Sequence, residues 1–532
     1  MSESDSRPRP PFLIALPQGL CVSGVSLWAV RLASGLAQHG HPVGLIVHDE
    51  PAGRRRLEAK LPRDVRTFNA RDLPPMGETR GDLSPFIAIY RDAVRQMADE
   101  TGYPVVLSPN LSGDCYGVAA ALCSAQPEIV RIVGWQHSDI QYDYRVLGRY
   151  EPIIAKFVGV SERITNQLRQ RLPARAGDIV RLPYGVPAAE QPPRRPPPAG
   201  RPIRFVYTGR MEHHQKRILA LPAMSDELNR RGVDHKLVLR GDGPAAKDID
   251  RAIQSRPDIE RRDADDQGSV RADLEWADVF VLASRFEGLS ISMLEAMGRG
   301  CVPVVTGAVS GTDEAVQPGL NGRIVEVDEA DDEQAVGCAL AEAVASLPDH
   351  DITAMSHAAW RTVMDRFSLA AHCAAASDLI EAVAARPPRW WPADRPCAFS
   401  APGAAGEGTV PADAATRMRS LLTRLAGRRI IIHGAGRHTT ELGPVLAEFS
   451  GSILAIADDD RQRHGSRLCN CPIIDPHSAG DTGATDVVIS SWLHEPAIWS
   501  RRAVYERQGL AVHRLYAGEG NKDKEPAGLL GR

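Results

Sequence analysis

The sequence lacks the features of an integral membrane protein and of a disulfide-stapled one. No apolar run approaches the ~18–20 residues that a transmembrane helix needs. The opening residues 1–11 are polar and proline-rich, unlike a secretory signal. The nine cysteines are scattered without framework spacing, which is typical of reduced thiols inside the cell. We therefore expect a cytoplasmic protein, and peripheral contact with the inner face of the membrane stays open.

Neither sign of charge predominates, and no metal motif is present in the sequence. Lys plus Arg number 63 and Asp plus Glu number 67, which gives a net charge of −4. Without a basic excess, the composition excludes bulk nucleic-acid binding. Cys469 and Cys471 form the one close cysteine pair, and a single intervening residue with no matching second pair does not suit a zinc site.

Strand-like and helix-like segments alternate along the chain, an order that predicts parallel sheets covered by helices. Prolines are concentrated at 187–202, and Pro, Ala and Gly at 386–411. We interpret both segments as breaks, because proline donates to neither a helix nor a strand ladder. A helical pattern over about 354–385 precedes the second break. We expect a first domain at 12–190, a second at 200–386, a linker at 387–415 and a third domain at 416–518.

The run that begins at Ser284 is the most informative segment of the chain. A strand-like stretch at 277–283 leads into it, and apolar residues at helical spacing follow from Ile291. Such a junction offers free backbone N–H groups and the positive end of a helix to an anion. Glu287 is expected in the loop and Glu295 about two turns into the helix. Two carboxylates beside a phosphate-binding helix start suit a nucleotide sugar, which has hydroxyls at both ends and a diphosphate between.

Two cations follow the first strand of the second domain. Arg210 lies just past the expected strand end and Lys216 six residues further on. Both can reach the crevice at the carboxyl ends of parallel strands, where open sheets bind ligands. An Arg and a Lys converging on a diphosphate neutralise it, and they stabilise the charge that a departing nucleotide acquires.

Together these residues resemble the retaining glycosyltransferases of family 4, also described as glycosyl transferases group 1, over roughly residues 12–385. That family has the GT-B fold. The resemblance therefore implies an α/β protein with two Rossmann-like domains facing a cleft, an acceptor side first and a donor side second, plus a third small Rossmann-like α/β domain. The motifs that carry it are Ser23 to Ser26, His137, Val160-Ser161, Tyr184 to Val186, Gly209-Arg210 with Lys216, Gly241 to Pro244, Glu287 with Glu295, Gly300 to Val305, Gly311 to Glu314 and Gly319 to Gly322.

The resemblance also implies roles for individual residues. Arg210 and Lys216 would hold the donor diphosphate, Glu295 would accept from the ribose hydroxyls, and Glu287 would contact the sugar. His137 would line the sugar pocket, although an ordinary packed histidine is the alternative. The remaining donor-binding residues would be Gly24, Gly209, Gly288, Leu289 and Ser290.

Two positions depart from the family pattern. Lys216 is followed by Arg217 where the family usually has glycine. In the first glycine turn, Ser23 precedes Gly24 where a second glycine is common. Both departures concern the donor pocket rather than the reaction class.

The implied reaction transfers a hexose from a UDP- or GDP-linked donor to a hydroxyl of a glycan or glycolipid acceptor, with retained configuration, in polysaccharide or glycoconjugate biosynthesis. In the family's front-face substitution the leaving phosphate oxygen takes the acceptor proton, so no protein nucleophile is needed. The protein then contributes orientation and charge stabilisation. No cofactor is expected for transfer, and no metal, because Arg210, Lys216 and the helix start neutralise the diphosphate.

The third domain opens with a partial dinucleotide fingerprint. A strand-like run enters Gly434-x-Gly436, and Asp458 follows at about the spacing of a ribose-binding acid. The run resembles small Rossmann-like domains appended to sugar-modifying and methyl-transferring enzymes. An NAD-like nucleotide is one interpretation, and a turn kept for packing or protein contacts is the other.

Three alternatives to a glycosyltransferase remain. A non-catalytic binding or scaffold protein could keep the GT-B body, but the intact charged residues speak against it. A nucleotide-cofactor oxidoreductase centred on the third domain would need a catalytic Tyr-Lys or His pair, which does not accompany the turn. A nearer alternative is a glycan-active phosphorylase or a sucrose-synthase-like enzyme on the same fold. A phosphorylase would need a lysine in a cofactor-aldehyde context, and none is evident.

Overall fold

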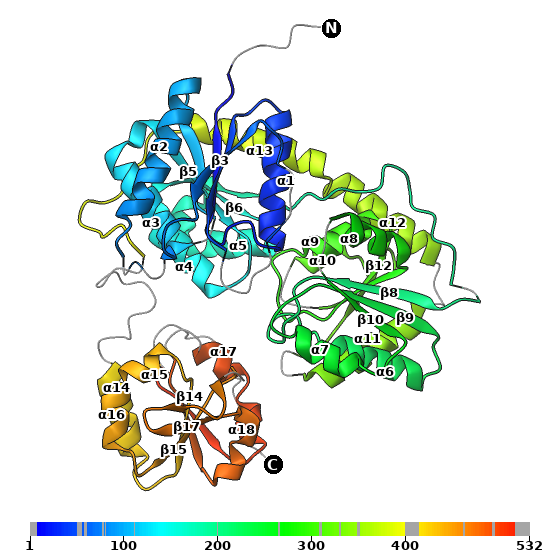
Figure 1. The fold of residues 1–532 in the computed structure, drawn as a ribbon, viewed down its shortest axis with the longest axis vertical. Coiled ribbons are helices and arrows are strands. Elements are labelled where there is room, and N and C mark those ends of the chain that lie inside the picture. Colours follow the sequence, from blue (N-terminus) through cyan, green and yellow to red (C-terminus); the bar gives the residue numbers. More distant parts are fainter. Residues whose placement is uncertain are drawn as a thin grey trace, which may run out of the picture. The chain divides into compact units, whose positions relative to one another are not determined.

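The computed structural model describes residues 8–516, apart from gaps at 51–55, 58–60, 77–78, 80, 111, 199, 264–266, 308–310, 329–330, 348–351, 400–413, 461–462 and 492–494. The chain divides into two compact units, Met1–Ala404 and Ala405–Arg532. The first unit contains two parallel sheets and the second contains one largely parallel sheet (Figure 1). The predicted α/β class, with two Rossmann-like domains of the GT-B type and a third α/β sheet, is confirmed.

The first sheet has seven strands in the order β3-β2-β1-β4-β5-β6-β7, and every neighbouring pair is parallel. Its central strands are buried along their whole length, because helices cover both faces. The strands are β1 (Phe12–Leu16), β2 (Val43–His48), β3 (Val65–Ala70), β4 (Val105–Ser108), β5 (Val130–Gln136), β6 (Ile154–Gly159) and β7 (Ile179–Arg181). The helices are α1 (Gly24–Gln38), α2 (Ser84–Thr101), α3 (Gly113–Ala125), α4 (Gln141–Arg149) and α5 (Glu162–Arg171).

The second sheet has six parallel strands in the order β10-β9-β8-β11-β12-β13. Helices α8, α9 and α12 lie on one face, and α6, α7 and α11 on the other (Figure 1). The strands are β8 (Ile203–Thr208), β9 (His235–Arg240), β10 (Ile259–Arg262), β11 (Val279–Leu282), β12 (Val302–Thr306) and β13 (Arg323–Val325). The helices are α6 (Ala220–Arg230), α7 (Ala246–Ile253), α8 (Gln267–Trp276), α9 (Ile291–Gly298), α10 (Thr312–Ala315), α11 (Glu333–Ala345) and α12 (Ile352–Arg366).

The expected helix over 354–385 is broken into two. Ser368 ends the continuity, because its side chain accepts a hydrogen bond from the Ala371 N–H and so caps a new helix, α13 (Leu369–Ala384). Helix α13 returns to the first sheet and runs beside α1 (Figure 1), where a side chain at Gly35 would collide with Cys373. The second domain therefore ends in a helix that completes the first.

The chain after α13 also packs on the first domain. Trp391 is buried and its ring lies 5.1 Å from that of Tyr150, whereas Trp390 is exposed. Phe399 packs so closely on α3 that a side chain at Gly113 would meet its ring. The described start of the expected linker, up to residue 399, thus covers the first domain, and residues 400–413 lie outside the described residues.

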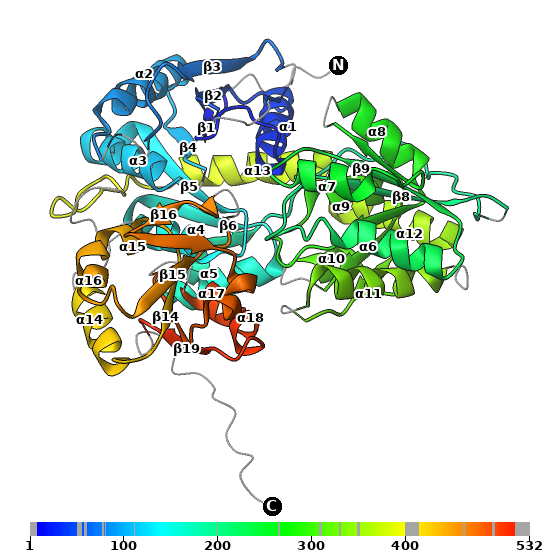
Figure 2. The ribbon, with the colours of Figure 1, turned by 60° about the horizontal axis from the view of Figure 1, so that its bottom comes forward.

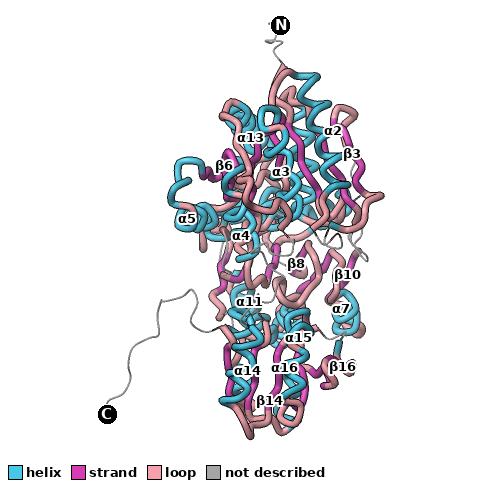
Figure 3. Tube along the Cα trace, turned by 90° about the vertical axis from the view of Figure 1, so that its left-hand side faces the viewer, coloured by secondary structure: helices cyan, strands magenta, loops and turns pink. Residues whose placement is uncertain are grey.

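The third sheet has the order β16-β17-β15-β14-β18-β19, parallel except for the hairpin of β16 with β17. Helices α14 and α16 lie along one face of this sheet (Figures 2 and 3), and α18 lies along the other (Figures 1 and 2). The strands are β14 (Ile430–His433), β15 (Ile453–Ala457), β16 (Arg467–Leu468), β17 (Cys471–Ile474), β18 (Asp486–Ile489) and β19 (Ala511–Arg514). The helices are α14 (Ala414–Arg424), α15 (Arg437–Glu441), α16 (Gly443–Glu448), α17 (Glu495–Ser500) and α18 (Ala503–Glu506).

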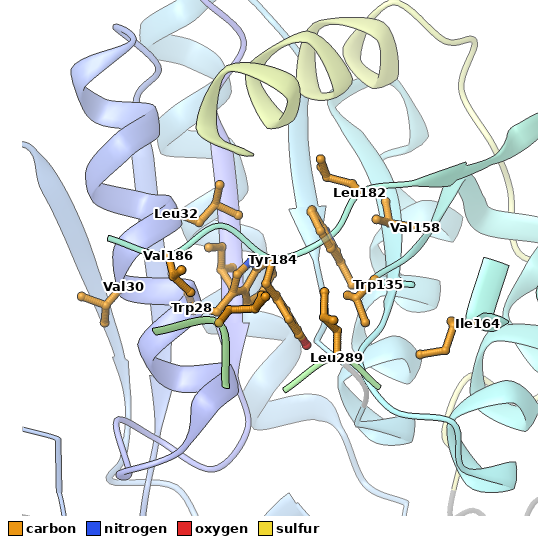
Figure 4. Close-up of a cluster of buried hydrophobic side chains, with 14 of the residues drawn as sticks. Trp28, Val30, Leu32, Trp135, Val158, Ile164, Leu182, Tyr184, Val186 and Leu289 are labelled. Carbon is orange, nitrogen blue, oxygen red and sulfur yellow. The ribbon is translucent and has the colours of Figure 1, made fainter. Parts of the chain in front are cut away.

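One apolar cluster joins the first two domains (Figure 4). Trp28 of α1, Trp135 of β5 and Tyr184 after β7 come from the first domain, and Leu289 from the loop after β11 comes from the second. Leu289 is 3% exposed. Burying a leucine side chain is worth roughly 1.5–3 kcal/mol, so this contact ties the Glu287 loop to the first domain. Among the described helices, none is both long and apolar enough to span a bilayer.

Candidate active site

The predicted strand–loop–helix junction is present between β11 and α9. Ser290 caps α9, because its hydroxyl accepts a hydrogen bond from the Met293 N–H at 3.3 Å. Glu287 lies in the loop, as expected. Glu295 is the fifth residue of α9, so it lies about one turn into the helix rather than two.

Glu287 and Lys216 form a nearly buried ion pair. Lys216 Nζ lies 2.5 Å from Glu287 Oε1, and the two side chains are 13% and 9% exposed. Ser284 Oγ donates to the same carboxylate oxygen at 2.6 Å. Residues 71 positions apart in sequence therefore meet at one carboxylate. Hydrogen bonds between charged groups are stronger than neutral ones, so Glu287 is held in a defined orientation.

Gln215 connects Arg210, the other predicted cation, to Glu287. Its Nε2 donates to the Phe286 carbonyl at 3.1 Å and to Glu287 Oε2 at 3.4 Å. Its Oε1 accepts from Arg210 Nη2 at 3.3 Å. Nothing in the sequence pattern singled out Gln215, although its place beside Lys216 was a usable signal.

Arg210 is exposed, unlike Lys216 and Glu287. It follows Gly209, whose N–H donates to the Arg240 carbonyl at 3.1 Å. At Gly241 a side chain would come within 1.9 Å of the Gly209 carbonyl oxygen, so glycine lets the loops after β8 and β9 run in contact. The exposed guanidinium of Arg210 is therefore attached to a loop whose backbone is tightly packed against the loop after β9.

Arg217 occupies a backbone conformation that favours glycine. Its φ is 45°, in the left-handed region that side chains with a Cβ rarely adopt. The family's usual glycine at this position has a physical reason here, and Arg217 holds the same turn with its side chain 2% exposed.

Glu295 pairs with a residue of the first domain that the sequence pattern did not identify. Arg31 of α1 donates from Nη2 to Glu295 Oε1, and the side chains are 14% and 12% exposed. Close by, the Cβ that Gly24 lacks would lie 3.4 Å from Ile291 Cδ1, so the first turns of α1 and α9 are in contact. The structure brings Gly24, Glu295 and Ser290 into one neighbourhood.

Gly288 is in direct backbone contact with the first domain. A side chain there would come within 2.0 Å of the His137 carbonyl oxygen. The Gly288 carbonyl accepts from the Gly311 N–H at 2.9 Å. A second ion pair also bridges the domains, because Arg181 Nη2 lies 2.5 Å from Glu314 Oε2.

His137 is buried among aromatic rings of the first domain. Its Nδ1 lies 2.7 Å from the Tyr184 hydroxyl and its Nε2 lies 2.8 Å from Asn110 Oδ1. Burial lowers the pKa of His137 to about 3, so the ring is neutral. A neutral ring donates from Nε2 to Asn110 and accepts at Nδ1 from Tyr184. Both ring nitrogens thus have protein partners. This arrangement suits a residue that lines the site rather than one that donates a proton to a ligand.

In the third domain, the predicted turn residues lie together. Gly434, Asp458 and Ser490 directly follow the adjacent strands β14, β15 and β18. Gly434 has φ 114°, and a side chain there would come within 2.9 Å of the Ser490 carbonyl. At Gly436 a Cβ would have no atom within 4 Å.

Asp458 is engaged by the backbone of its own neighbourhood. Its Oδ2 accepts from the Ala435 N–H at 2.5 Å and its Oδ1 from the Asp460 N–H at 2.9 Å. The acid expected to meet a ribose therefore braces the glycine turn. Throughout the described residues, no group of three or more His, Cys, Asp or Glu side chains is arranged to hold a metal ion.

The second domain matches a known protein family. Residues 202–347 match the family model described as glycosyl transferases group 1. A lipopolysaccharide 1,6-galactosyltransferase of Salmonella typhimurium is 28% identical over 183 residues, which cover 33% of this chain and 49% of that protein. An alpha-D-kanosaminyltransferase of Streptomyces kanamyceticus is 32% identical over 128 residues, which cover 24% of this chain and 32% of that protein. The chain thus spans about half the length of the first relative and about a third of the second.

Solved structures with the same fold align over most of the chain. HepE of Anabaena, in complex with UDP-glucose, gives a TM-score of 0.52 at 16% identity, covering 70% of this chain and 99% of that one. A sucrose-phosphate synthase of Thermosynechococcus elongatus gives a TM-score of 0.54 at 16% identity, covering 70% and 98%. At these identities the likeness establishes the GT-B fold alone. The chain carries that fold, with the glycosyl transferases group 1 match in its second domain.

Proposed function

We propose that this protein is a retaining hexosyltransferase of family 4, which moves a hexose from a nucleotide diphosphate sugar to a hydroxyl of a glycan or glycolipid acceptor. The observation that carries the proposal is the ion pair of Lys216 with Glu287 beside the capped start of α9. The match of the surrounding domain to glycosyl transferases group 1 supports the reaction class. Two relatives named as sugar transferases support a hexose-like donor.

In this proposal the second domain holds the donor. Arg210 and Lys216 neutralise the diphosphate, and the free N–H groups at the start of α9 add to that field. Glu287 accepts from the sugar hydroxyls while Lys216 and Ser284 hold its carboxylate in place. Groups fixed before the reaction stabilise developing charge without reorganising, which is where their catalytic value lies.

The first domain then receives the acceptor. The aromatic residues around His137 give a rigid, neutral wall, and Gly24 and Gly288 leave backbone rather than side chains at the domain boundary. The acceptor hydroxyl attacks the anomeric carbon on the face that the diphosphate leaves. The departing phosphate oxygen takes the hydroxyl proton, so the C–O bond formed replaces the C–O bond broken with retained configuration.

The test is a panel of UDP- and GDP-linked hexoses with candidate glycan acceptors, measured as nucleotide diphosphate release. We expect nucleotide diphosphate to be released with one donor class. By NMR, the anomeric configuration of the product should be the same as that of the donor sugar. A scaffold protein would bind a nucleotide sugar without release. A product with inverted anomeric configuration would overturn the retaining mechanism. If no donor is bound and none yields nucleotide diphosphate, the proposed activity is overturned.

A further inference from the structure

The ion pair between Arg31 and Glu295 crosses from the first domain to the second at the site itself. Arg31 comes from α1 and Glu295 from α9, and the residues are 264 positions apart in sequence. Both side chains are about nine-tenths buried, at 14% and 12% exposure. The pair is therefore a buried contact between the first and second domains rather than a surface salt bridge.

The pair leaves half of the Glu295 carboxylate available. Arg31 occupies Oε1, while Oε2 has no hydrogen-bond partner among the described residues. A carboxylate accepts at two oxygens. Holding one oxygen with a guanidinium fixes the side-chain rotamer and leaves the other free for a ligand hydroxyl.

Stability alone is a weak reason for such a pair. Taking two charges out of water offsets most of their attraction, so buried ion pairs contribute little net folding energy. Glu295 also lies in α9, the helix whose N-terminus is the proposed diphosphate site, and an uncompensated carboxylate this close would repel the ligand. The cation of Arg31 removes that repulsion, which gives the pair a role in binding.

We propose that Arg31 is a positioning residue for the donor ribose. It acts through Glu295, so the first domain contributes to nucleotide recognition and the contact between the two domains is coupled to donor binding. The proposal rests on the proposed function, since it assigns the ribose to Glu295. It extends that function, because Glu295 would be positioned to bind the ribose hydroxyls only when α1 is in contact with α9.

The experiment compares binding of a nucleotide diphosphate with its 2′,3′-dideoxy analogue, by calorimetry on the full chain. The nucleotide is UDP or GDP, whichever the donor panel selects. In the wild type we expect the ribose hydroxyls to strengthen binding by ~10-fold or more, because they bond to a charged group. Arg31→Met keeps the side-chain stem and removes the charge. It should bring the two affinities within about two-fold of each other, by weakening the ribose-containing ligand.

Three further variants separate positioning from folding. Arg31→Lys keeps the charge without the fork and should recover part of the discrimination. Arg31→Met added to Glu295→Gln should cause no further loss, because the two residues act as one unit. Arg181→Met removes a different ion pair between the domains, the one with Glu314, and should preserve the discrimination. In turnover, Arg31→Met should raise the donor KM far more than it lowers kcat.

The outcomes distinguish this inference from the proposed function. A wild type that binds neither nucleotide overturns both. A wild type that binds the dideoxy analogue equally well, or an Arg31→Met variant that still discriminates, overturns the role of Arg31 and leaves the transferase intact. The same loss of discrimination in Arg181→Met would assign the effect to general domain contact and also overturn it.

Discussion

Two strand–turn–helix junctions in this chain share a local pattern and differ in how their acids are held. After β11, Glu287 and Glu295 receive cationic side chains from elsewhere in the fold, Lys216 and Arg31. In the turn after β14, the Ala435 N–H donates to Asp458, an acid that follows the neighbouring strand β15 and also accepts from the Asp460 N–H. A carboxylate held by side-chain cations is oriented for a ligand, whereas one bonded to backbone N–H groups stabilises the turns that contain those groups. The local sequence pattern predicts such a junction. Whether its acids pair with side-chain cations or with backbone N–H groups indicates whether the junction binds a ligand or stabilises the fold.

Removing the cation or the carboxylate of the first junction should have the largest effect. We expect Lys216→Met and Glu287→Gln each to lower kcat by ~10²–10³-fold, because each removes a preorganised charge. The double variant should lose little more than the worse single variant, since the residues are paired. Nucleotide diphosphate release measures the effect.

Lys236→Met is the matched control for that prediction. Lys236 is an exposed lysine of the same domain, and its ammonium donates to the Pro257 carbonyl at 2.9 Å. Its loss should leave turnover within two-fold of the wild type, in the range of ordinary surface changes of about 0.5 kcal/mol. Near-normal turnover in both Lys216→Met and Glu287→Gln would remove the site.

Adding one methyl group at the domain boundary should have the next largest effect. In Gly288→Ala the new Cβ would meet the His137 carbonyl oxygen, a backbone atom that cannot swing away. We expect a loss of about 1–3 kcal/mol in the free energy of unfolding, together with reduced transfer. Gly148→Ala is the control. Nothing lies within 4 Å of its new Cβ in α4, so it should stabilise slightly. Equal effects of the two changes would contradict the tight boundary.

Asp458→Ala tests the second junction. Losing two backbone hydrogen bonds to a carboxylate should destabilise the third domain by about 1–3 kcal/mol and leave transfer unchanged. Asp481→Ala, at an exposed position, should do neither. If NAD instead raises the Tm of the wild type, and not that of Asp458→Ala, then Asp458 binds a ribose and the two junctions are alike.

A fall in pH should have the smallest effect of all, a modest loss in the free energy of unfolding through one buried histidine near each junction. Burial lowers the pKa of His137 to about 3 and of His438 to about 4. The unfolded chain therefore binds protons below about pH 6.5 while the folded chain does not, so stability is full above that pH and falls below it. At pH 5.5 each group should reduce the free energy of unfolding by roughly 1.4 kcal/mol.

Denaturant titrations at pH 7.5 and 5.5 measure that loss. His438→Gln should make the pH dependence shallower, because a neutral amide does not titrate. His477→Gln, at an exposed position, should leave it unchanged. A steeper dependence in His438→Gln would reverse the assigned direction.

Local patterns predicted the sheets and the junctions well. The apolar run before Ser284 predicted β11, and the helical spacing from Ile291 predicted α9. The break at Ser368 was missed, because helical spacing continues across it and only packing of α13 on the first sheet decides the new direction. Arg31 and Gln215 were missed as well, since neither residue type carries a motif by itself.

By itself, the sequence determined the strand–loop–helix order, the acids and cations near each turn, and the glycine positions where backbones must approach. The tertiary structure alone decided which charges meet. Lys216 reaches Glu287 across 71 positions and Arg31 reaches Glu295 across 264. The physical reason is that period and capping act over a few residues, whereas an ion pair depends on which helices and loops pack together.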